Sequence, residues 1–297
     1  MDLAAAVDLA AVAADLAVAD LVVDLAAAAL VAAAQAEAGN LSSMTKFLIS
    51  LVFLLHLSAI AQQLTREENL QQIKQLDSII AFEPTAENYF FRGTAKYNIG
   101  EYPAALSDFD KAIALNDSDF DSFYSRGILR HKITDYNGAI TDFTRCIGLK
   151  PQSAKSFYGR GYARSMTGDY DGALADYKAS NEIKPNASAY FNSGLILQKA
   201  KNHLASIAEF NKAIELNPTF TEAYSNRAIS RAYARQPEAK MDFDIAISFE
   251  PDNGELYYNR AMYFLNYKTG DYCVDLKKAR DLGFTAAKSV IAKNCKP

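Results

Sequence analysis

The sequence has little of the chemistry that catalytic and metal sites need. Its 297 residues contain no tryptophan, three cysteines and three histidines. His131 and His203 have no cysteine, aspartate or glutamate at a metal-ligand spacing, so we expect both to be solvated surface residues and predict no metal site. A glycine-rich phosphate loop, a nucleophile elbow and a close carboxylate pair outside the turns are also missing. We therefore expect no enzymatic activity and no cofactor.

The chain also lacks a large excess of charge of either sign. Residues 1–61 hold one basic and six acidic side chains, which leaves 30 basic and 29 acidic side chains of the 31 and 35 in the whole chain. A near-neutral chain has no electrostatic footprint for nucleic acid or for an anionic membrane. We expect neither class of partner.

Residues 44–61 have the three parts of a secretory signal peptide. Lys46 supplies the positive charge, residues 47–57 are mostly apolar, and small residues precede a cleavage site after Ala61. The apolar run is too short for a membrane span of about 20 residues, so cleavage is favoured over a retained anchor. We predict a secreted or periplasmic mature chain without a membrane span.

The segment before this signal, residues 1–43, is of low complexity. From residue 2 to residue 34 it contains only Asp, Leu, Ala and Val. Its scattered aspartates argue against a membrane span, because each costs about 2.5–3.5 kcal/mol at a bilayer centre. The Asp-Leu pairs recur at irregular intervals, which argues against a coiled coil. We interpret the segment as a misassigned upstream start or an artificial extension before Met44; the alternative is an amphipathic partner helix.

Six copies of one unit of 33 or 34 residues fill residues 86–283. Each copy has a tiny residue four positions after an opening aromatic, then a second large residue followed three positions later by a small one. Apolar residues at i, i+3, i+4 and i+7 indicate a helix in each half, and Asp, Gly, Asn and Pro between the halves indicate a turn. Each unit is therefore predicted to be a helical hairpin. The copies open at Tyr89, Phe123, Phe157, Tyr190, Tyr224 and Tyr257.

This pattern resembles the tetratricopeptide repeat, a 34-residue helix-turn-helix unit with large, small, aromatic, small and proline columns. Proline closes four of the six units, the first of them at Pro151. The resemblance implies an all-α fold, a right-handed superhelical solenoid of six hairpins. Residues 62–85 are expected to supply a flanking helix, over 65–82, and residues 284–297 a capping helix.

A column of arginines runs beside a column of acids. Five of the six units carry Arg directly before the tiny residue and Asp 15 or 16 residues later, as in Arg160 and Asp176. We predict a ladder of partly buried ion pairs within or between hairpins. The alternative, an anion-binding row of arginines, is disfavoured because an acid accompanies every arginine.

Solenoids present a long curved surface that commonly serves recognition. By resemblance to the family, its concave wall comes from the first helix of each hairpin. Tyrosine is favoured at interfaces because it buries much area with few rotors to freeze. We expect a protein or extended peptide to lie along this wall; the alternative is that the rings pack mainly on the adjacent hairpin. The residues expected to line it are Phe90, Tyr97, Tyr124, Tyr158, Tyr162, Phe191, Tyr233 and Tyr258.

The carboxylate clamp, a peptide-binding version of the family, is matched in one position of five. Asn226 corresponds to the clamp asparagine, but Phe191 and Leu195 stand where the clamp has Lys and Asn. Glu255 and Asn259 likewise replace Lys and Arg. An adaptor for chaperone tails is therefore disfavoured.

The three cysteines fall into two groups. Cys146 occupies a small-residue column, so we expect a buried free thiol. Cys273 and Cys295 lie ten and twelve residues from the turn near Gly283, and antiparallel packing of the last two helices would bring their sulfurs together. We predict a disulfide between them, which an exported chain permits. The alternative is two unrelated small buried residues.

Together these features predict an exported, non-catalytic scaffold that binds a protein or peptide. The alternative is a structural subunit of a cell-envelope assembly that self-associates or stacks through its hairpin faces. The oligomeric state does not follow from the sequence.

Overall fold

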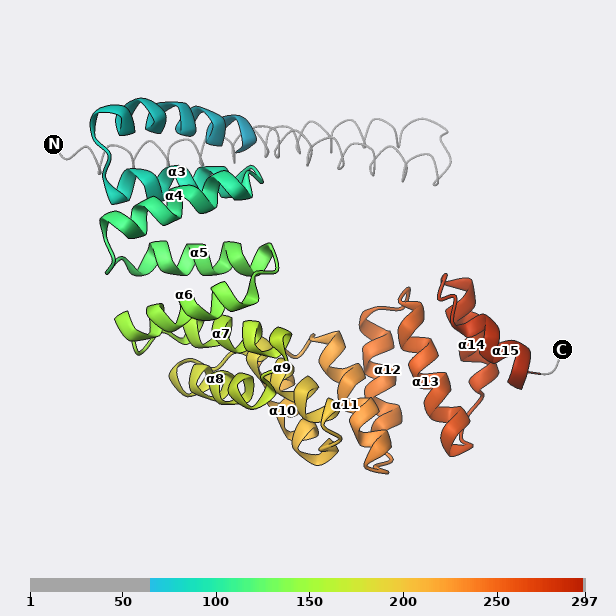
Figure 1. Cartoon of the computed structure of the whole chain (residues 1–297). Helices are drawn as coiled ribbons and strands as arrows, with labels where there is room; N and C mark the ends of the chain where they lie inside the picture. The colour runs from blue at the N-terminus through green and yellow to red at the C-terminus, as the bar shows by residue number, and fades with distance from the viewer. Residues whose placement is uncertain (1–64, 296–297) are drawn as a thin grey trace, which may run out of the picture. The chain divides into compact units, whose positions relative to one another are not determined.

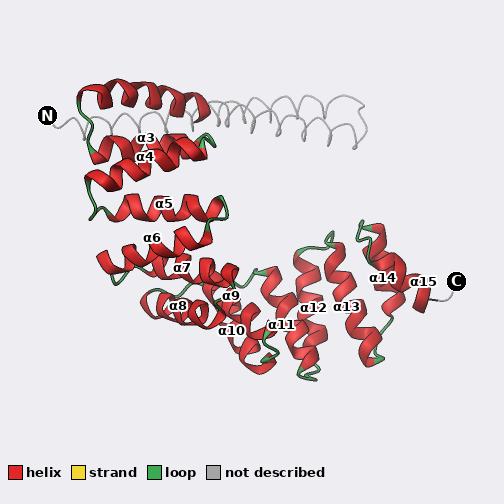
Figure 2. Ribbon diagram, viewed as in Figure 1, coloured by secondary structure: helices red, strands yellow, loops and turns green. Residues whose placement is uncertain are grey.

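The computed structural model describes residues 65–295, and these residues form helices joined by short turns (Figures 1 and 2). The predicted signal peptide at 44–61 and the extension at 1–43 lie outside the described residues. One helix covers residues 65–82, as expected. The others are α3 (Ala86–Asn98), α4 (Tyr102–Leu115), α5 (Phe120–Lys132), α6 (Tyr136–Leu149), α7 (Ala154–Thr167), α8 (Tyr170–Ile183), α9 (Ala187–Lys199), α10 (His203–Leu216), α11 (Thr221–Tyr233), α12 (Ala239–Phe249), α13 (Gly254–Tyr267), α14 (Tyr272–Asp281) and α15 (Ala287–Asn294).

The described residues divide into two compact units, 65–84 with 94–101 and 85–93 with 102–295. In the second unit the helices pack in chain order as sequential hairpins, each helix against the next (Figure 1). The predicted all-α solenoid of hairpins is confirmed. No described helix is long and apolar enough to cross a membrane, and residues 65–295 hold no cluster of three side chains suited to a metal ion.

A glycine on the first helix of a hairpin lies against an aromatic ring on the second helix. A Cβ atom added at Gly161 would lie 3.1 Å from the Tyr177 ring, and one added at Gly194 would lie 2.5 Å from the Phe210 ring. Both rings are fully buried. The tiny residue four positions after the opening aromatic is therefore required by the close approach of the two helices.

Each hairpin turn contains a residue in the left-handed conformation, and the sixth turn contains a second one, Gly270. In the second hairpin the amide of Asp135 donates to the carbonyl of Arg130 at 2.8 Å, the return bond of a Schellman motif. Asp135 then caps α6, because its side chain accepts a hydrogen bond from the amide of Gly138. The first left-handed residues of the six turns are Gly100, Thr134, Gly168, Lys201, Arg235 and Lys268.

The first helices of successive hairpins contact one another. Contacts join α5 to α7, α7 to α9, α9 to α11 and α11 to α13. We call this row of helices, α5, α7, α9, α11 and α13, the first-helix wall. It is the surface that the resemblance assigns to partner binding.

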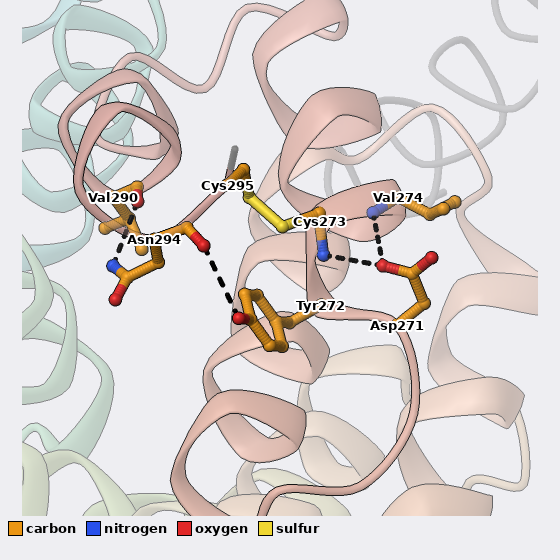
Figure 3. Close-up of a disulfide and its surroundings, with 7 residues drawn as sticks. All are labelled: Asp271, Tyr272, Cys273, Val274, Val290, Asn294 and Cys295. Atoms are coloured by element: carbon orange, nitrogen blue, oxygen red, sulfur yellow. Dashed lines mark hydrogen bonds between the residues drawn. A yellow bond between two sulfur atoms is a disulfide. The ribbon is translucent and has the colours of Figure 1, made fainter. Parts of the chain in front are cut away.

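A disulfide between Cys273 and Cys295 ties α14 to the end of α15 (Figure 3). Asp271 accepts hydrogen bonds from the amides of Cys273 and Val274 and so caps α14, while the Tyr272 hydroxyl donates to the carbonyl of Asn294 at 3.4 Å (Figure 3). On the chain-entropy model, closing a loop of this size contributes roughly 3 kcal/mol.

The third cysteine, Cys146, is a buried free thiol, as predicted. Burial raises the pKa of the Cys146 thiol to about 12, and the charge of Asp142 acts in the same direction. Since the thiolate is the reactive form, this cysteine is expected to be inert in the folded protein.

We expect Gly194→Ala to lower the free energy of unfolding by about 1–2 kcal/mol net, because the overlap with the Phe210 ring outweighs the gain in helix propensity. Gly148→Ala is the matched control on α6, where an added Cβ meets nothing within 4 Å. That change should raise stability by up to about 1 kcal/mol. Urea unfolding followed by far-ultraviolet circular dichroism measures both. Equal effects of the two changes would contradict the close approach.

Thiol titration should count a single free thiol per chain in the denatured, non-reduced protein, since two of the three cysteines are paired. The folded protein should show none at about pH 8, because Cys146 is buried and protonated there. Three reactive thiols after denaturation would exclude the disulfide.

Candidate functional site

The arginine column is engaged in ion pairs, as predicted. Arg160 grips Asp176 with two nitrogens, Nε at 2.9 Å and Nη2 at 2.7 Å. Asp176 is only 2% exposed, so the carboxylate is satisfied inside the hairpin. The same two-nitrogen contact recurs in Arg92–Asp108, Arg126–Asp142, Arg227–Asp242 and Arg260–Asp275.

The ladder also links neighbouring hairpins. Nη1 of Arg126 donates to Asp110 at 2.6 Å, and Nη1 of Arg260 donates to Asp244 at 2.6 Å, both on the preceding second helix. Burial alone would lower the pKa of Arg126, but its hydrogen bonds to Asp142 and Asp110 raise the pKa above the usual value. The arginine column is therefore structural, which weighs against the anion-binding alternative.

A second set of arginines was not foreseen from the sequence. Arg164 lies one helical turn after Arg160 and donates to the same carboxylate, Asp176, at 2.8 Å. Arg130 and Arg231 occupy the same position in their hairpins, at 2.9 Å from Asp142 and 2.8 Å from Asp242. The spacing of four residues between two arginines was the available signal, because it places both on one face of a helix.

The fourth hairpin has Ser193 in the arginine column and Glu209 in the acid column. Lys212 lies 5.1 Å from the centre of the Tyr190 ring and 3.2 Å from Glu209. Lys111, Arg145 and Lys278 lie in the same way against the opening rings of their units, each of which also carries the column arginine. The fourth hairpin therefore keeps the cation of the second helix and lacks the arginine of the first.

Five of the predicted binding rings follow the opening aromatic of their unit. Four of them contact a ring on the second helix of their own hairpin: the ring centres of Tyr124 and Phe143 are 5.7 Å apart, and those of Tyr158 and Tyr177 are 5.9 Å apart. All five are half-buried and keep some exposed surface. The other three are Phe90 against Phe109, Phe191 against Phe210 and Phe220, and Tyr258 against Phe284.

Two further predicted tyrosines pair with the histidines. His131 meets Tyr162 edge-on with ring centres 4.7 Å apart, and His203 stacks on Tyr233 at 4.8 Å. The expectation that both histidines are solvated surface residues was wrong, since each is half-buried. Burial lowers the pKa of His131. Tyr233 is itself 67% exposed.

The last predicted ring, Tyr97, is half-buried near the end of α3. Tyr158 and Tyr162 lie together, four residues apart on α7, while the others are distributed one or two to a helix. The six predicted residues from Tyr124 to Tyr258 therefore lie on the successive helices of the first-helix wall.

A pocket of about 240 Å³ opens on the first-helix wall between α11 and α13. Of the eight predicted residues only Tyr233 lines it; we call it the tyrosine pocket. Four residues of α13 form one side of it, and their spacing of i, i+4, i+7 and i+8 places them on one face of the helix. The comparison of equivalent positions between units did not consider this spacing. These four are Asn259, Tyr263, Asn266 and Tyr267.

Comparison with known proteins agrees with this geometry. Residues 187–220 match the family model described as a tetratricopeptide repeat. This segment, the fourth unit of the chain, is thus similar to a tetratricopeptide repeat. None of the curated proteins matches this repeat protein.

Solved structures share the fold. The C-terminal part of a TPR repeat-containing protein from Cytophaga hutchinsonii is 17% identical to this repeat protein with a TM-score of 0.64, over 80% of this chain and 99% of that one. YrrB, described as a TPR protein with an unusual peptide-binding site, is 21% identical with a TM-score of 0.54, over 62% and 97%. A tetratricopeptide repeat protein from Parabacteroides merdae is 19% identical with a TM-score of 0.53, over 77% and 96%. At these identities the likeness shows the fold alone.

A double-mutant cycle on Arg160→Ala and Asp176→Ala should give a coupling energy of about 2–3 kcal/mol, because Asp176→Ala leaves the guanidinium of Arg160 without its carboxylate and Arg160→Ala leaves the buried carboxylate with Arg164 alone. The control cycle uses Lys178 and Glu182, whose side chains are 78% and 66% exposed, and should give at most about 0.5 kcal/mol. Chemical denaturation measures both cycles. Similar couplings for the two pairs would contradict the structural role of the ladder.

Proposed function

We propose that this repeat protein is an exported, non-catalytic scaffold that binds an extended segment of another protein along the first-helix wall. The observation that carries the proposal is the half-buried ring at the position after the opening aromatic in five of the six units. Tyr124, Tyr158 and Tyr258 each rest on another ring and keep exposed surface.

Rings held in this way are suited to recognition. Because Phe143 and Tyr177 already support Tyr124 and Tyr158, little rotamer freedom remains to be lost when a partner covers them. Burial raises the pKa of both tyrosines, so their hydroxyls stay protonated and can donate to backbone carbonyls of a bound segment. Apolar contact and hydrogen bonding are thus offered by the same side chains.

Three observations support the remaining parts of the proposal. The peptide-binding site named in the description of YrrB occurs on the same fold. Export is supported by the signal-peptide pattern of residues 44–61 and by the disulfide between Cys273 and Cys295, because structural disulfides persist mainly in oxidising compartments.

Selection of peptides from a displayed random library against the full chain tests the binding role. The double variant Tyr124→Ala/Tyr158→Ala should weaken binding of the selected peptides about 30-fold or more, since a tyrosine at the centre of an interface contributes about 2 kcal/mol or more. Phe249→Ala on α12 is the control, because Phe249 is exposed but lies on a second helix. Its affinity should equal that of the wild type.

Unchanged affinity of the double variant would refute binding along the wall. Sedimentation at several protein concentrations adds a second measurement. Concentration-dependent oligomers in the absence of any selected peptide would instead favour the structural subunit of an envelope assembly.

A further inference from the structure

In the hairpin turns of the last three units, a lysine or arginine occupies a position whose backbone conformation only glycine adopts without strain. Lys201, Arg235 and Lys268 have φ angles of 61°, 58° and 52°, the left-handed conformation that Gly100 and Gly168 adopt in other turns. Side chains other than glycine rarely take this conformation, because Cβ approaches the following carbonyl oxygen. Backbone strain of this kind is frequently found at functional sites, and here it coincides with charge.

Two of these cations line one hollow. Arg235 and Lys268 face a hollow of about 670 Å³, which shares Tyr263, Asn266 and Tyr267 with the tyrosine pocket. The lining of the hollow contains these two cations and no carboxylate. The other lining residues are Gln236, Pro237 and Thr269.

Both cations lack a partner within residues 65–295, where no side-chain hydrogen bond or ion pair reaches either of them. Arginines on the helices that precede these two turns are paired, in contrast. Arg231 of α11 lies one turn before Arg235 and is bound to the buried Asp242, and Arg260 of α13 is bound to Asp275. The turn cations are therefore positive charges that the fold itself does not neutralise.

We propose that the tyrosine pocket and this hollow together bind an extended segment of a partner protein that carries an apolar side chain two residues before an aspartate or glutamate. The inference rests on the proposed function and names the chemistry of the bound segment. Alternate side chains of an extended chain point to the same side, so the apolar side chain enters the pocket while the carboxylate reaches Arg235 and Lys268. The amides of Asn259 and Asn266 can both donate to and accept from its backbone.

The probe is a fluorescein-labelled peptide, Gly-Ser-Ser-Phe-Ser-Asp-Ser-Ser-Gly, titrated with the full chain and followed by fluorescence anisotropy. A peptide with Asn in place of Asp and one with Ala in place of Phe are the matched probes. The Asp peptide should bind roughly fivefold more tightly than the Asn peptide, the scale of a solvent-exposed ion pair. Its binding should weaken at high salt because exposed charges are screened. The Ala peptide should also bind more weakly than the Phe peptide.

Glycine substitutions separate recognition from folding. Arg235→Gly and Lys268→Gly remove the charge and relieve the strained backbone, so each should raise the melting temperature while weakening binding of the Asp peptide about fivefold. Lys201→Gly is the matched control, because it makes the same change of charge and backbone at a turn outside the hollow. Its affinity for the Asp peptide should equal that of the wild type.

Equal affinity for the Asp and Asn peptides would overturn the inference. So would an equal loss of affinity in Lys201→Gly and Arg235→Gly, since that result would show an effect of net charge alone. If peptides selected from the library still depend on Tyr124 and Tyr158, either result overturns only this inference and leaves the proposed function standing.

Discussion

The close approach of a bare backbone to a buried ring sets the distance between the two helices of a hairpin. The ion pairs depend on this contact, because Arg160 directly precedes Gly161 and Asp176 directly precedes Tyr177. Once the ring of Tyr177 lies over Gly161, the neighbouring guanidinium and carboxylate are opposite each other. The charge ladder is therefore a consequence of the packing contact.

The ladder in turn fixes how the hairpin aligns. A carboxylate buried to the extent of Asp142 would be strongly unfavourable without partners, and it receives three nitrogens from Arg126 and Arg130. Two-nitrogen contact requires one orientation of guanidinium against carboxylate, so sliding of one helix along the other breaks it. Apolar packing holds the helices together, and the buried pairs define their register.

The sequence was sufficient to predict the features that most of the units share. Spacing and side-chain size predicted the hairpins, and the paired columns predicted the contact of Arg160 with Asp176. Most of what it did not predict depends on contacts between hairpins. Tyr263 and Tyr267 line a pocket together with residues of α11, and His203 stacks on Tyr233 of the following hairpin.

The left-handed turn residues show a second limit of sequence interpretation. Gly100 and Gly168 mark this column as a place of positive φ, but a lysine or arginine in the same column carries no such signal. The way the first helix ends imposes the conformation, so it becomes visible only with the backbone in place. Strain at Arg235 is a property of the turn, while the charge at Arg235 is a property of the residue.

The residues of the repeated columns and the residues that differ from one hairpin to the next lie on different faces of the same helices. On α13, Arg260 and Ala261 face the second helix and belong to columns found throughout the repeat, whereas Asn259, Tyr263 and Asn266 face the wall. Since the contacts that hold a hairpin together come from the repeated columns, the wall residues differ from one hairpin to the next without disturbing the fold. That separation allows the tyrosine pocket and the neighbouring hollow with its unpaired cations to occur at the fifth and sixth hairpins, and changes to their residues should alter binding without disrupting the fold.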